Sequence, residues 1–240
     1  MTDKKVFLVT GGNRGIGKEI VRQLVTLGHT VYFGARKAEE GRHALEELTR
    51  IGEARLLQIE LTDPHSLMSA AEQIKKESGR LDGLINNAGI CADYSPPTTA
   101  SIEALRSHFE VNYFGTVMVT QAMLPLLRAG QWRVIVNVST GLASMGLQGE
   151  VSWPYHRVNL LAYNSSKTAL NMFTVSLAKE LRPEGFRVNS VNPGHIATDL
   201  GGPNAPGTVE QGAAISVKCA LEGPDGQTGL FLSSGGLVPW

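Results

Sequence analysis

The sequence lacks a net charge and any long apolar run. Its Lys and Arg residues number 22, as do its Asp and Glu residues, so the formal net charge is +0 at pH 7. A chain without a positive field or a basic cluster has no electrostatic attraction for nucleic acid or for an anionic membrane surface. No apolar run approaches the roughly 20 residues that a membrane-spanning helix needs. We therefore expect neither nucleic acid nor a membrane as a partner.

The sequence also has little cysteine and no pattern typical of secretion. Cys91 and Cys219 lie far apart and match neither a metal-binding spacing nor a disulfide framework. We interpret both as free thiols and expect no metal site. The first residues lead directly into an apolar, strand-like segment, without the features of a signal peptide. These observations predict a cytoplasmic protein.

Short apolar segments alternate with segments of helical periodicity. The expected strands have the composition of strands buried on both faces: Val6–Val9, 30–34, 54–61, 81–85, 134–138, 186–191 and a last one near 230–232. Helical patterns separate them, including long ones over 37–51 and 101–127. Such alternation predicts an α/β fold with a doubly wound parallel sheet of the Rossmann type. The 240 residues suit a single domain, 1–240.

A glycine-rich turn follows the first strand and leads into an amphipathic helix. Gly11, Gly15 and Gly17 form the pattern G-x-x-x-G-x-G, which is neither the G-x-G-x-x-G dinucleotide fingerprint nor a P-loop. A strand, a glycine turn and a helix in this order aim backbone N–H groups at a phosphate. An ordinary glycine turn is the alternative, but the order of elements favours dinucleotide binding.

The end of the second strand indicates which dinucleotide is bound. An acid at this place binds the free 2′-hydroxyl of NAD, whereas an arginine accommodates the 2′-phosphate of NADP. Here the strand ends in Arg36 and Lys37, with no acid between strand and cations. We predict NADPH/NADP+ as the cofactor, with Arg36 as the phosphate-binding residue and Arg14 as support.

Polar residues follow three later strands or lie on helices near them. A turn of small residues at 86–89 follows the fourth strand, and Ser139 and Thr140 follow the fifth. The sixth strand leads into 192–199, and open α/β sheets bind ligands at such carboxyl ends. Asn112 lies within a predicted helix, as either a satisfied core amide or part of a polar relay.

Tyr163 and Lys167 are four residues apart in a strongly helical segment. On a helix this spacing makes them neighbours on one face. A free phenol titrates near ~10, and a cation within about 4–6 Å favours its ionised form. Such a tyrosine can exchange a proton with a carbonyl or alcohol oxygen.

In their order and spacing these motifs resemble the short-chain dehydrogenase/reductase family, and more narrowly its NADPH-dependent carbonyl reductases. The resemblance covers nearly the whole chain. It implies that Tyr163 is the general acid, that Lys167 lowers its pKa, that the Thr140 hydroxyl binds the substrate oxygen and that Asn112 holds a relay water. The cofactor-binding residues that it implies are Gly11, Asn13, Arg14, Gly15, Ile16, Gly17, Arg36, Glu60, Leu61, Asn87, Ala88, Gly89, Tyr163, Lys167, Pro193, Gly194, Ile196 and Thr198.

The sequence departs from the family pattern at three places. Thr140 stands where the family has serine, which leaves Ser139 as a fallback for the substrate hydroxyl, and Glu60 stands where it has aspartate. The third departure is extra residues within 149–160, whose apolar side chains include Trp153 and Tyr155. We expect this segment to dock on its own subunit, to wall the substrate pocket and to disfavour dimers, giving a monomer or weak homodimer. A mobile loop over an ordinary dimer or tetramer is the alternative.

The function that these features predict is hydride transfer from NADPH to a small-molecule ketone or aldehyde, or the reverse oxidation of a secondary alcohol. A 3-oxoacyl thioester reductase is an alternative, although it predicts a basic surface for an acidic carrier. A non-catalytic NADP(H)-binding sensor is the second alternative, although such a protein would not need Tyr163 and Lys167. We expect the pocket walls at 92–98, 142–160 and 200–208. His195 is either a pocket residue or a satisfied polar group.

Overall fold

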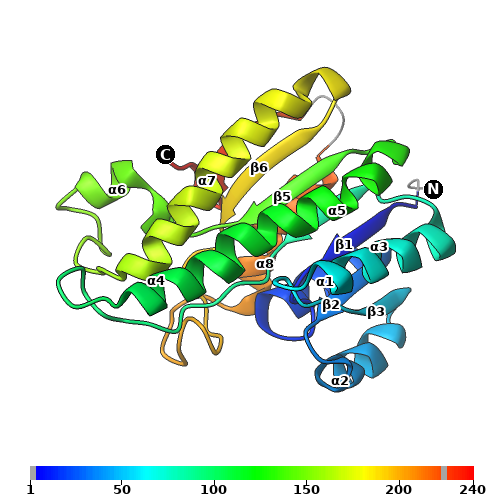
Figure 1. Cartoon of the computed structure of the whole chain (residues 1–240), viewed down its shortest axis with the longest axis horizontal. Helices are drawn as coiled ribbons and strands as arrows, with labels where there is room; N and C mark the ends of the chain where they lie inside the picture. The colour runs from blue at the N-terminus through cyan, green and yellow to red at the C-terminus, as the bar shows by residue number, and fades with distance from the viewer. Residues whose placement is uncertain (1–3, 223–225) are drawn as a thin grey trace.

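A computed structural model describes residues 4–222 and 226–240, and one eight-stranded sheet runs through its centre (Figure 1). The strand order is β3-β2-β1-β4-β5-β6-β7-β8, and every neighbouring pair is parallel except β7 and β8. From β1 the chain continues to β2 and β3 on one side and returns to β4 on the other. This reversal is the switch point at which open α/β sheets bind ligands. The predicted doubly wound, Rossmann-type α/β fold is confirmed.

The strands lie close to their predicted positions and differ at their ends. Their bounds are β1 Val6–Val9, β2 Thr30–Ala35, β3 Ala54–Gln58, β4 Gly83–Asn86, β5 Val134–Val138, β6 Arg187–Asn192, β7 Phe231–Ser233 and β8 Gly236–Leu237. The third strand was predicted to reach Leu61 but ends at Gln58. The chain turns away there, because the Glu60 N–H bonds to the Ser66 hydroxyl instead of to a neighbouring strand. The antiparallel β8 was not predicted.

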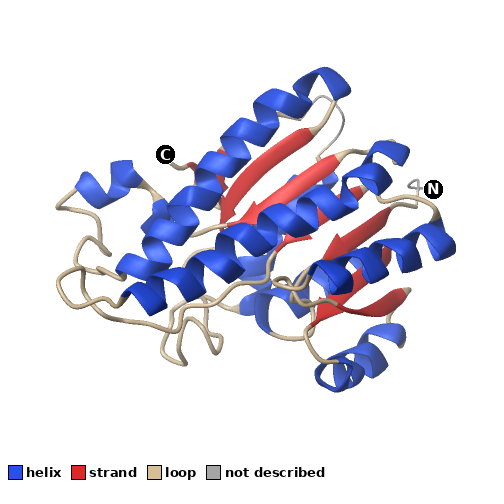
Figure 2. Ribbon diagram, viewed as in Figure 1, coloured by secondary structure: helices blue, strands red, loops and turns tan. Residues whose placement is uncertain are grey.

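Helices cover both faces of the sheet. One face packs against α1 (Gly15–Thr26), α2 (Ala38–Thr49) and α8 (Val209–Leu221), and the other against α3 (Pro64–Ser78), α5 (Thr116–Ala129) and α7 (Leu161–Leu181). In Figure 2 the second group of helices lies in front of the red strands. Each face has its own buried apolar cluster, and alternate residues of β5 belong to different clusters. The wholly buried strands therefore follow from their apolar sequence.

The single long helix predicted over 101–127 is interrupted. An α-helix, α4 (Ile102–Phe109), is followed by a π-helical segment, η1 (Glu110–Gly115), before α5 begins. π-helical segments are rare and frequently occur at functional sites. Asn112 lies in η1, where its side-chain amide donates to the Ser166 hydroxyl of α7 at 3.0 Å.

Because β1 to β7 are parallel, the loops that follow them all lie at one edge of the sheet (Figure 1). Two short helices that were not predicted lie here, the 3-10 helix η2 (Gly141–Ala143) and α6 (Met145–Gly149), whereas η3 (Arg182–Glu184) follows α7. The carboxyl-terminal residues return to this region, where the Ser144 hydroxyl donates to the carbonyl of Pro239. Among the described residues, no helix has the length and apolarity that crossing a membrane requires.

Candidate active site

A cavity of about 760 Å³ opens at the carboxyl ends of the strands. Its size lies in the range of ligand pockets, which is about 300–1,000 Å³. It is lined by every residue that the sequence analysis assigned to the cofactor, together with Thr140, Tyr163 and Lys167. Asn112 is the one assigned residue that does not line it. The structure thus brings together side chains from seven segments of the chain that the sequence could only group by resemblance.

The glycine turn has a backbone that requires glycine at specific positions. Gly11 and Gly15 have φ angles of +62° and +53°, which side-chain-bearing residues rarely adopt. A Cβ atom on Gly17 would lie 2.1 Å from the carbonyl oxygen of Gly11. No side chain caps the first turn of α1, so its N–H groups remain for a ligand. This cradle fits a dinucleotide pyrophosphate.

The turn after β4 is fastened to the glycine turn. The Asn87 amide donates to the carbonyl oxygens of Thr10 and Gly11 at 3.0 and 3.1 Å. The Thr10 hydroxyl accepts from the N–H groups of Asn87 and Ala88. These bonds cross the β1–β4 switch point, so the two turns form one rigid floor.

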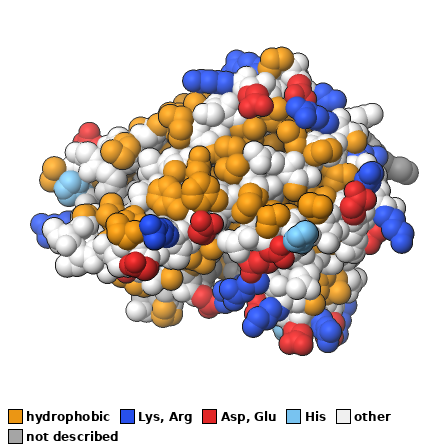
Figure 3. Space-filling model, in the orientation of Figure 1, with side chains coloured by type: hydrophobic (Ala, Val, Ile, Leu, Met, Phe, Trp, Pro, Cys, Tyr) orange, Lys and Arg blue, Asp and Glu red, His pale blue; other side chains and the backbone are white. Residues whose placement is uncertain are grey.

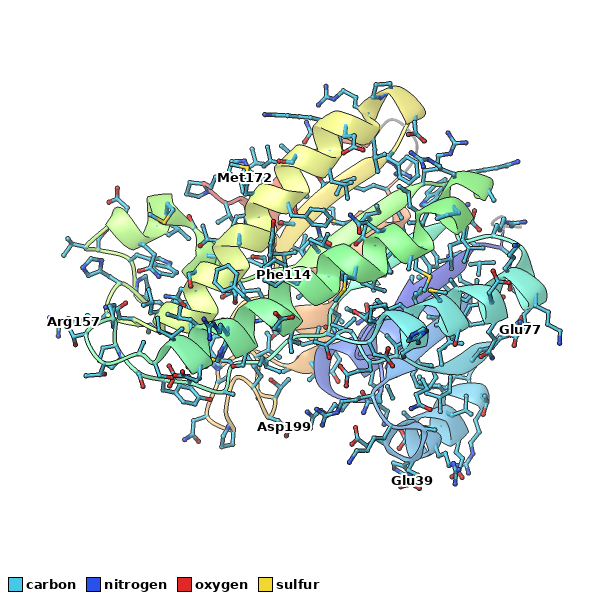
Figure 4. All side chains as sticks on the ribbon, in the orientation of Figure 1. Glu39, Glu77, Phe114, Arg157, Met172 and Asp199 are labelled. Carbon is cyan, nitrogen blue, oxygen red and sulfur yellow. The ribbon has the colours of Figure 1, made fainter. Side chains whose placement is uncertain are left out.

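Arg36 is exposed at the end of β2 and lines the cavity, and its binding of a 2′-phosphate stays a prediction. Glu40 of α2 lines the same corner. Arg14 also lines the cavity, and its guanidinium donates to the Asp199 carboxylate at 2.8 Å. Figure 4 shows Asp199 on the loop after β6. Both side chains of this ion pair are about three-quarters exposed, and phosphate binding by Arg14 stays a prediction.

Tyr163 stands on the first turn of α7 and is only 7% exposed. Burial raises the pKa of its hydroxyl, the nearby Cys91 thiol adds to this, and a hydrogen bond with Thr140 opposes it. The Thr140 side chain therefore lies close to the phenol. A tyrosine in this environment stays protonated at neutral pH and can donate a proton.

Lys167 lies one turn further along α7 and is 4% exposed. Its ammonium donates to the carbonyl oxygen of Val138 at 2.9 Å, and burial lowers its pKa to about 8. A Cβ atom on Gly89 would lie 3.2 Å from the ammonium nitrogen, so only glycine leaves this space open. That Lys167 lowers the pKa of Tyr163 stays a prediction.

Asn112 is a fully satisfied buried amide. Its carbonyl oxygen accepts from the N–H of Ile90 at 2.8 Å, and its nitrogen donates to the carbonyl of Ile90 at 2.9 Å and to Ser166. These bonds fix the chain that runs from Gly89 into the cavity wall. The structure supports the core-amide alternative, and the relay water stays a prediction.

Ser139 and Thr140 have different surroundings. The Ser139 hydroxyl is buried and has no hydrogen-bond partner among the described residues. Thr140 is half-buried and borders Tyr163, and its hydroxyl also accepts from the Leu142 N–H at 3.3 Å. Both residues line the cavity, but only the Thr140 hydroxyl is close enough to the phenol to influence its pKa. We therefore retain Thr140 as the candidate for polarising the substrate.

The segment 149–160 docks on its own subunit, as predicted. Trp153 and Tyr155 are half-buried and line the cavity, whereas Val151 is 80% exposed. The segment does not cover the outer face of α5 and α7, however. Phe114 and Met172, labelled in Figure 4, are 46% and 64% exposed, and Figure 3 shows apolar side chains gathered over this face. The steric reason for expecting a monomer is therefore absent, and the oligomeric state stays a prediction.

The predicted walls are correct only in part. Of the predicted wall segment 92–98 only Tyr94 lines the cavity, and of 200–208 only Leu200 and Gly201 do. Asn192, Ala197 and Asp199 lie in the segment 192–199 that the sequence analysis indicated. The cavity residues that it did not assign are mainly small or apolar: Thr10, Gly34, Glu40, Ile59, Ile90, Cys91, Val111, Val138 and Gly141. Most have no chemical signal of their own, but Ile90 and Cys91 directly follow the turn after the fourth strand, a position that could have revealed them. His195 lines the cavity and bonds to the Gly201 carbonyl at 2.8 Å, so both readings of it are correct.

The geometry agrees with comparisons to known proteins. The family model of the short chain dehydrogenases matches residues 5–207. A short-chain dehydrogenase, anuI, of Penicillium roqueforti is 35% identical over 92% of this chain and 90% of its own length. A cyclopentanol dehydrogenase of a Comamonas species is 36% identical over 82% of this chain and 74% of its own. The NADPH-bound carbonyl reductase from chicken fatty liver has a TM-score of 0.86 at 25% identity, covering 99% of both chains.

Proposed function

The chain belongs to the short-chain dehydrogenase family of oxidoreductases, and from this premise we propose that it transfers hydride from NADPH to a ketone or aldehyde carbonyl, or reversibly oxidises a secondary alcohol. The observation that carries the proposal is the buried Tyr163 side chain, which lines the cavity close to Thr140 and one helical turn from the buried Lys167. The NADPH-bound carbonyl reductase of similar fold and the relative named for an alcohol substrate support it.

The residues divide the chemistry among themselves. The Thr140 hydroxyl donates to the substrate carbonyl oxygen and polarises it, while the Tyr163 hydroxyl supplies the proton that the developing alkoxide takes up. Bound NADPH supplies the hydride. The Lys167 ammonium, fixed on the Val138 carbonyl, stabilises negative charge on the phenol as the proton leaves.

The cofactor is held by the glycine turn and selected at the end of β2. The N–H groups of α1 receive the pyrophosphate. Arg36 is the exposed cation nearest in sequence to the end of β2, and no acid occupies the strand end itself. A 2′-phosphate gains a charge-assisted hydrogen bond from such an arginine, whereas a 2′-hydroxyl gains less. This supports NADPH over NADH.

The test mixes the purified protein with NADPH and a panel of ketones, aldehydes and quinones, and follows the oxidation of NADPH by the decrease in NADPH absorbance. We expect turnover with at least one carbonyl class and preference for NADPH. A protein that binds NADPH but turns over no carbonyl in the panel would instead be the non-catalytic sensor. Turnover confined to carrier-bound 3-oxoacyl thioesters would identify the thioester reductase.

A further inference from the structure

We propose that Trp153, Tyr155 and His195 form an aromatic wall that selects uncharged, ring-containing ketones for the site. The inference rests on the proposed function, because it names the substrate class of the same cavity. Nothing in the hydride-transfer chemistry itself requires these three rings. Their arrangement therefore needs its own explanation.

The rings of the aromatic wall contact one another edge to face. Trp153 and Tyr155 have centroids 5.5 Å apart with planes at 64°, and Tyr155 and His195 have centroids 5.8 Å apart at 85°. Such T-shaped pairs are favourable ring arrangements. They join the segment 149–160 to the loop after β6, two parts of the chain that are far apart in sequence. The wall is thus continuous across one side of the substrate space.

The indole of Trp153 lies next to the reacting end of the cavity. A Cβ atom on Gly141 would be 3.2 Å from the Cζ2 atom of Trp153, so the ring packs closely over this glycine. Gly141 directly follows Thr140, whose hydroxyl we assign to the substrate oxygen. A carbonyl held there has its substituents alongside the indole face or edge.

The segment that bears the rings is held in place by consecutive turns. The Trp153 N–H donates to the carbonyl of Glu150 at 3.0 Å, and the Val158 N–H donates to that of Tyr155 at 2.9 Å. The Gln148 amide donates to the Leu142 carbonyl at 3.1 Å, which ties the segment to the chain after β5. Rings that are already ordered lose little conformational entropy when a ligand packs on them.

Among the described residues that line the cavity, each charged group near the reacting end already has a hydrogen-bond partner. Lys167 donates to the Val138 carbonyl, and Asp199 is paired with Arg14. The remaining charged lining residues, Arg36, Glu40 and Glu60, belong to the corner formed by β2, α2 and the chain after β3. The other side chains near the wall are apolar or weakly polar: Ile90, Cys91, Leu142, Val158 and Leu160. A substrate carboxylate would be desolvated there without compensation.

The experiment compares three methyl ketones with the complete protein and NADPH. Acetophenone and 2-octanone have equal carbon number but differ in having a ring, and 4-acetylbenzoate adds an anion to the ring. The variants are Trp153→Leu and Tyr155→Leu, which keep an apolar side chain, and the control is Val151→Ala, on the same segment but exposed. Circular dichroism and thermal unfolding check that each variant folds.

We expect kcat/KM for acetophenone to exceed that for 4-acetylbenzoate by about tenfold or more, because the anion has no partner. Loss of one ring pair should lower kcat/KM for acetophenone roughly 2- to 12-fold, the range for an aromatic pair. The value for 2-octanone should change less than about twofold. Val151→Ala should change none of the three.

The inference is overturned if the anionic ketone is reduced as well as acetophenone, or if the ring variants lower all ketones equally. Quenching of tryptophan fluorescence by acetophenone provides a measurement that does not depend on turnover. Saturable quenching that Trp153→Leu abolishes supports the wall even if no ketone is reduced, an outcome that would refute only the proposed function. Absence of saturable quenching together with absence of turnover overturns both.

Discussion

Replacement of Lys167 by methionine tests whether the buried ammonium lowers the stability of the folded protein while it is required for turnover. The side chain is 4% exposed, its ammonium donates to the Val138 carbonyl, and burial lowers its pKa from 10.5 to about 8. This lowering corresponds to roughly 3 kcal/mol against the charged form. Lys167→Met removes that cost and also a charge-assisted hydrogen bond worth about 1.5–3 kcal/mol. We expect the free energy of unfolding at pH 7 to stay equal or to rise by up to about 1.5 kcal/mol, while turnover is lost.

The lowered pKa of Lys167 also sets the direction of a pH effect. Between about pH 8 and pH 10.5 the unfolded chain still holds this proton, whereas the folded chain has released it. The unfolded state then binds more protons, so the contribution of Lys167 to the free energy of unfolding rises with pH through this window. Below about pH 8 both states are protonated and the folded protein carries the whole cost. The stability gained by Lys167→Met should therefore shrink as the pH rises from 8 to 10.5.

The assay is urea unfolding followed by tryptophan fluorescence at pH 7, 8, 9 and 10. The matched control is Lys179→Met, because Lys179 lies on the same helix but is exposed. The free energy of unfolding of Lys179→Met should depend on pH as that of the unmutated protein does. The reasoning about the buried ammonium is refuted if Lys167→Met shows the same pH dependence as the unmutated protein, or if it is less stable than that protein at pH 7. In kinetic assays of the unmutated protein, kcat should fall above about pH 8 as the ammonium is lost.

Four further outcomes are expected. Tyr163→Phe should leave NADPH binding intact and lower kcat about 10²- to 10⁴-fold, the range for general acid catalysis. A near-normal kcat in steady-state assays of NADPH oxidation would show that another group donates the proton. Thr140→Val should lower kcat about 10²- to 10³-fold, whereas Ser139→Ala should have a mild effect, and the reverse order would transfer the role to Ser139. Arg36→Ala should weaken NADPH about 10- to 150-fold in titrations, from about 1.5–3 kcal/mol for a charged contact, with little change for NADH; equal losses would contradict phosphate recognition. Light scattering at micromolar concentration tests the sequence-based expectation of a monomer or weak homodimer, which has lost its steric reason in the structure, and a stable tetramer would contradict this expectation.

Local sequence was sufficient for the strands and for most helix ends. β1 and all of β5 except Asn137 are apolar and buried, so composition alone identifies these strands. The Asp63 side chain accepts from the N–H of His65 at the start of α3, as the sequence around Pro64 predicted. Gly28, with φ +87°, ends α1 as expected. Each of these signals acts within a few residues.

The π-helical interruption at η1 could not be predicted in this way. Its residues suit an α-helix, and the wider turn is stabilised by contacts with distant parts of the chain. The Asn112 amide bonds to Ile90, and a Cβ atom on Gly115 would lie 2.8 Å from the Cβ of Leu61. These partners are set by tertiary packing, which overrides local preference.

By itself the sequence determined the fold class, the position of the glycine turn and the pairing of Tyr163 with Lys167, because strand burial, backbone freedom and helical spacing are local properties. Tertiary structure alone decided the electrostatic surroundings. It buried the Lys167 ammonium against the Val138 carbonyl, engaged Arg14 with Asp199, and left the outer face of α5 and α7 open. These are contacts between residues far apart in the chain, and pKa, charge pairing and exposure depend on what surrounds a side chain in space.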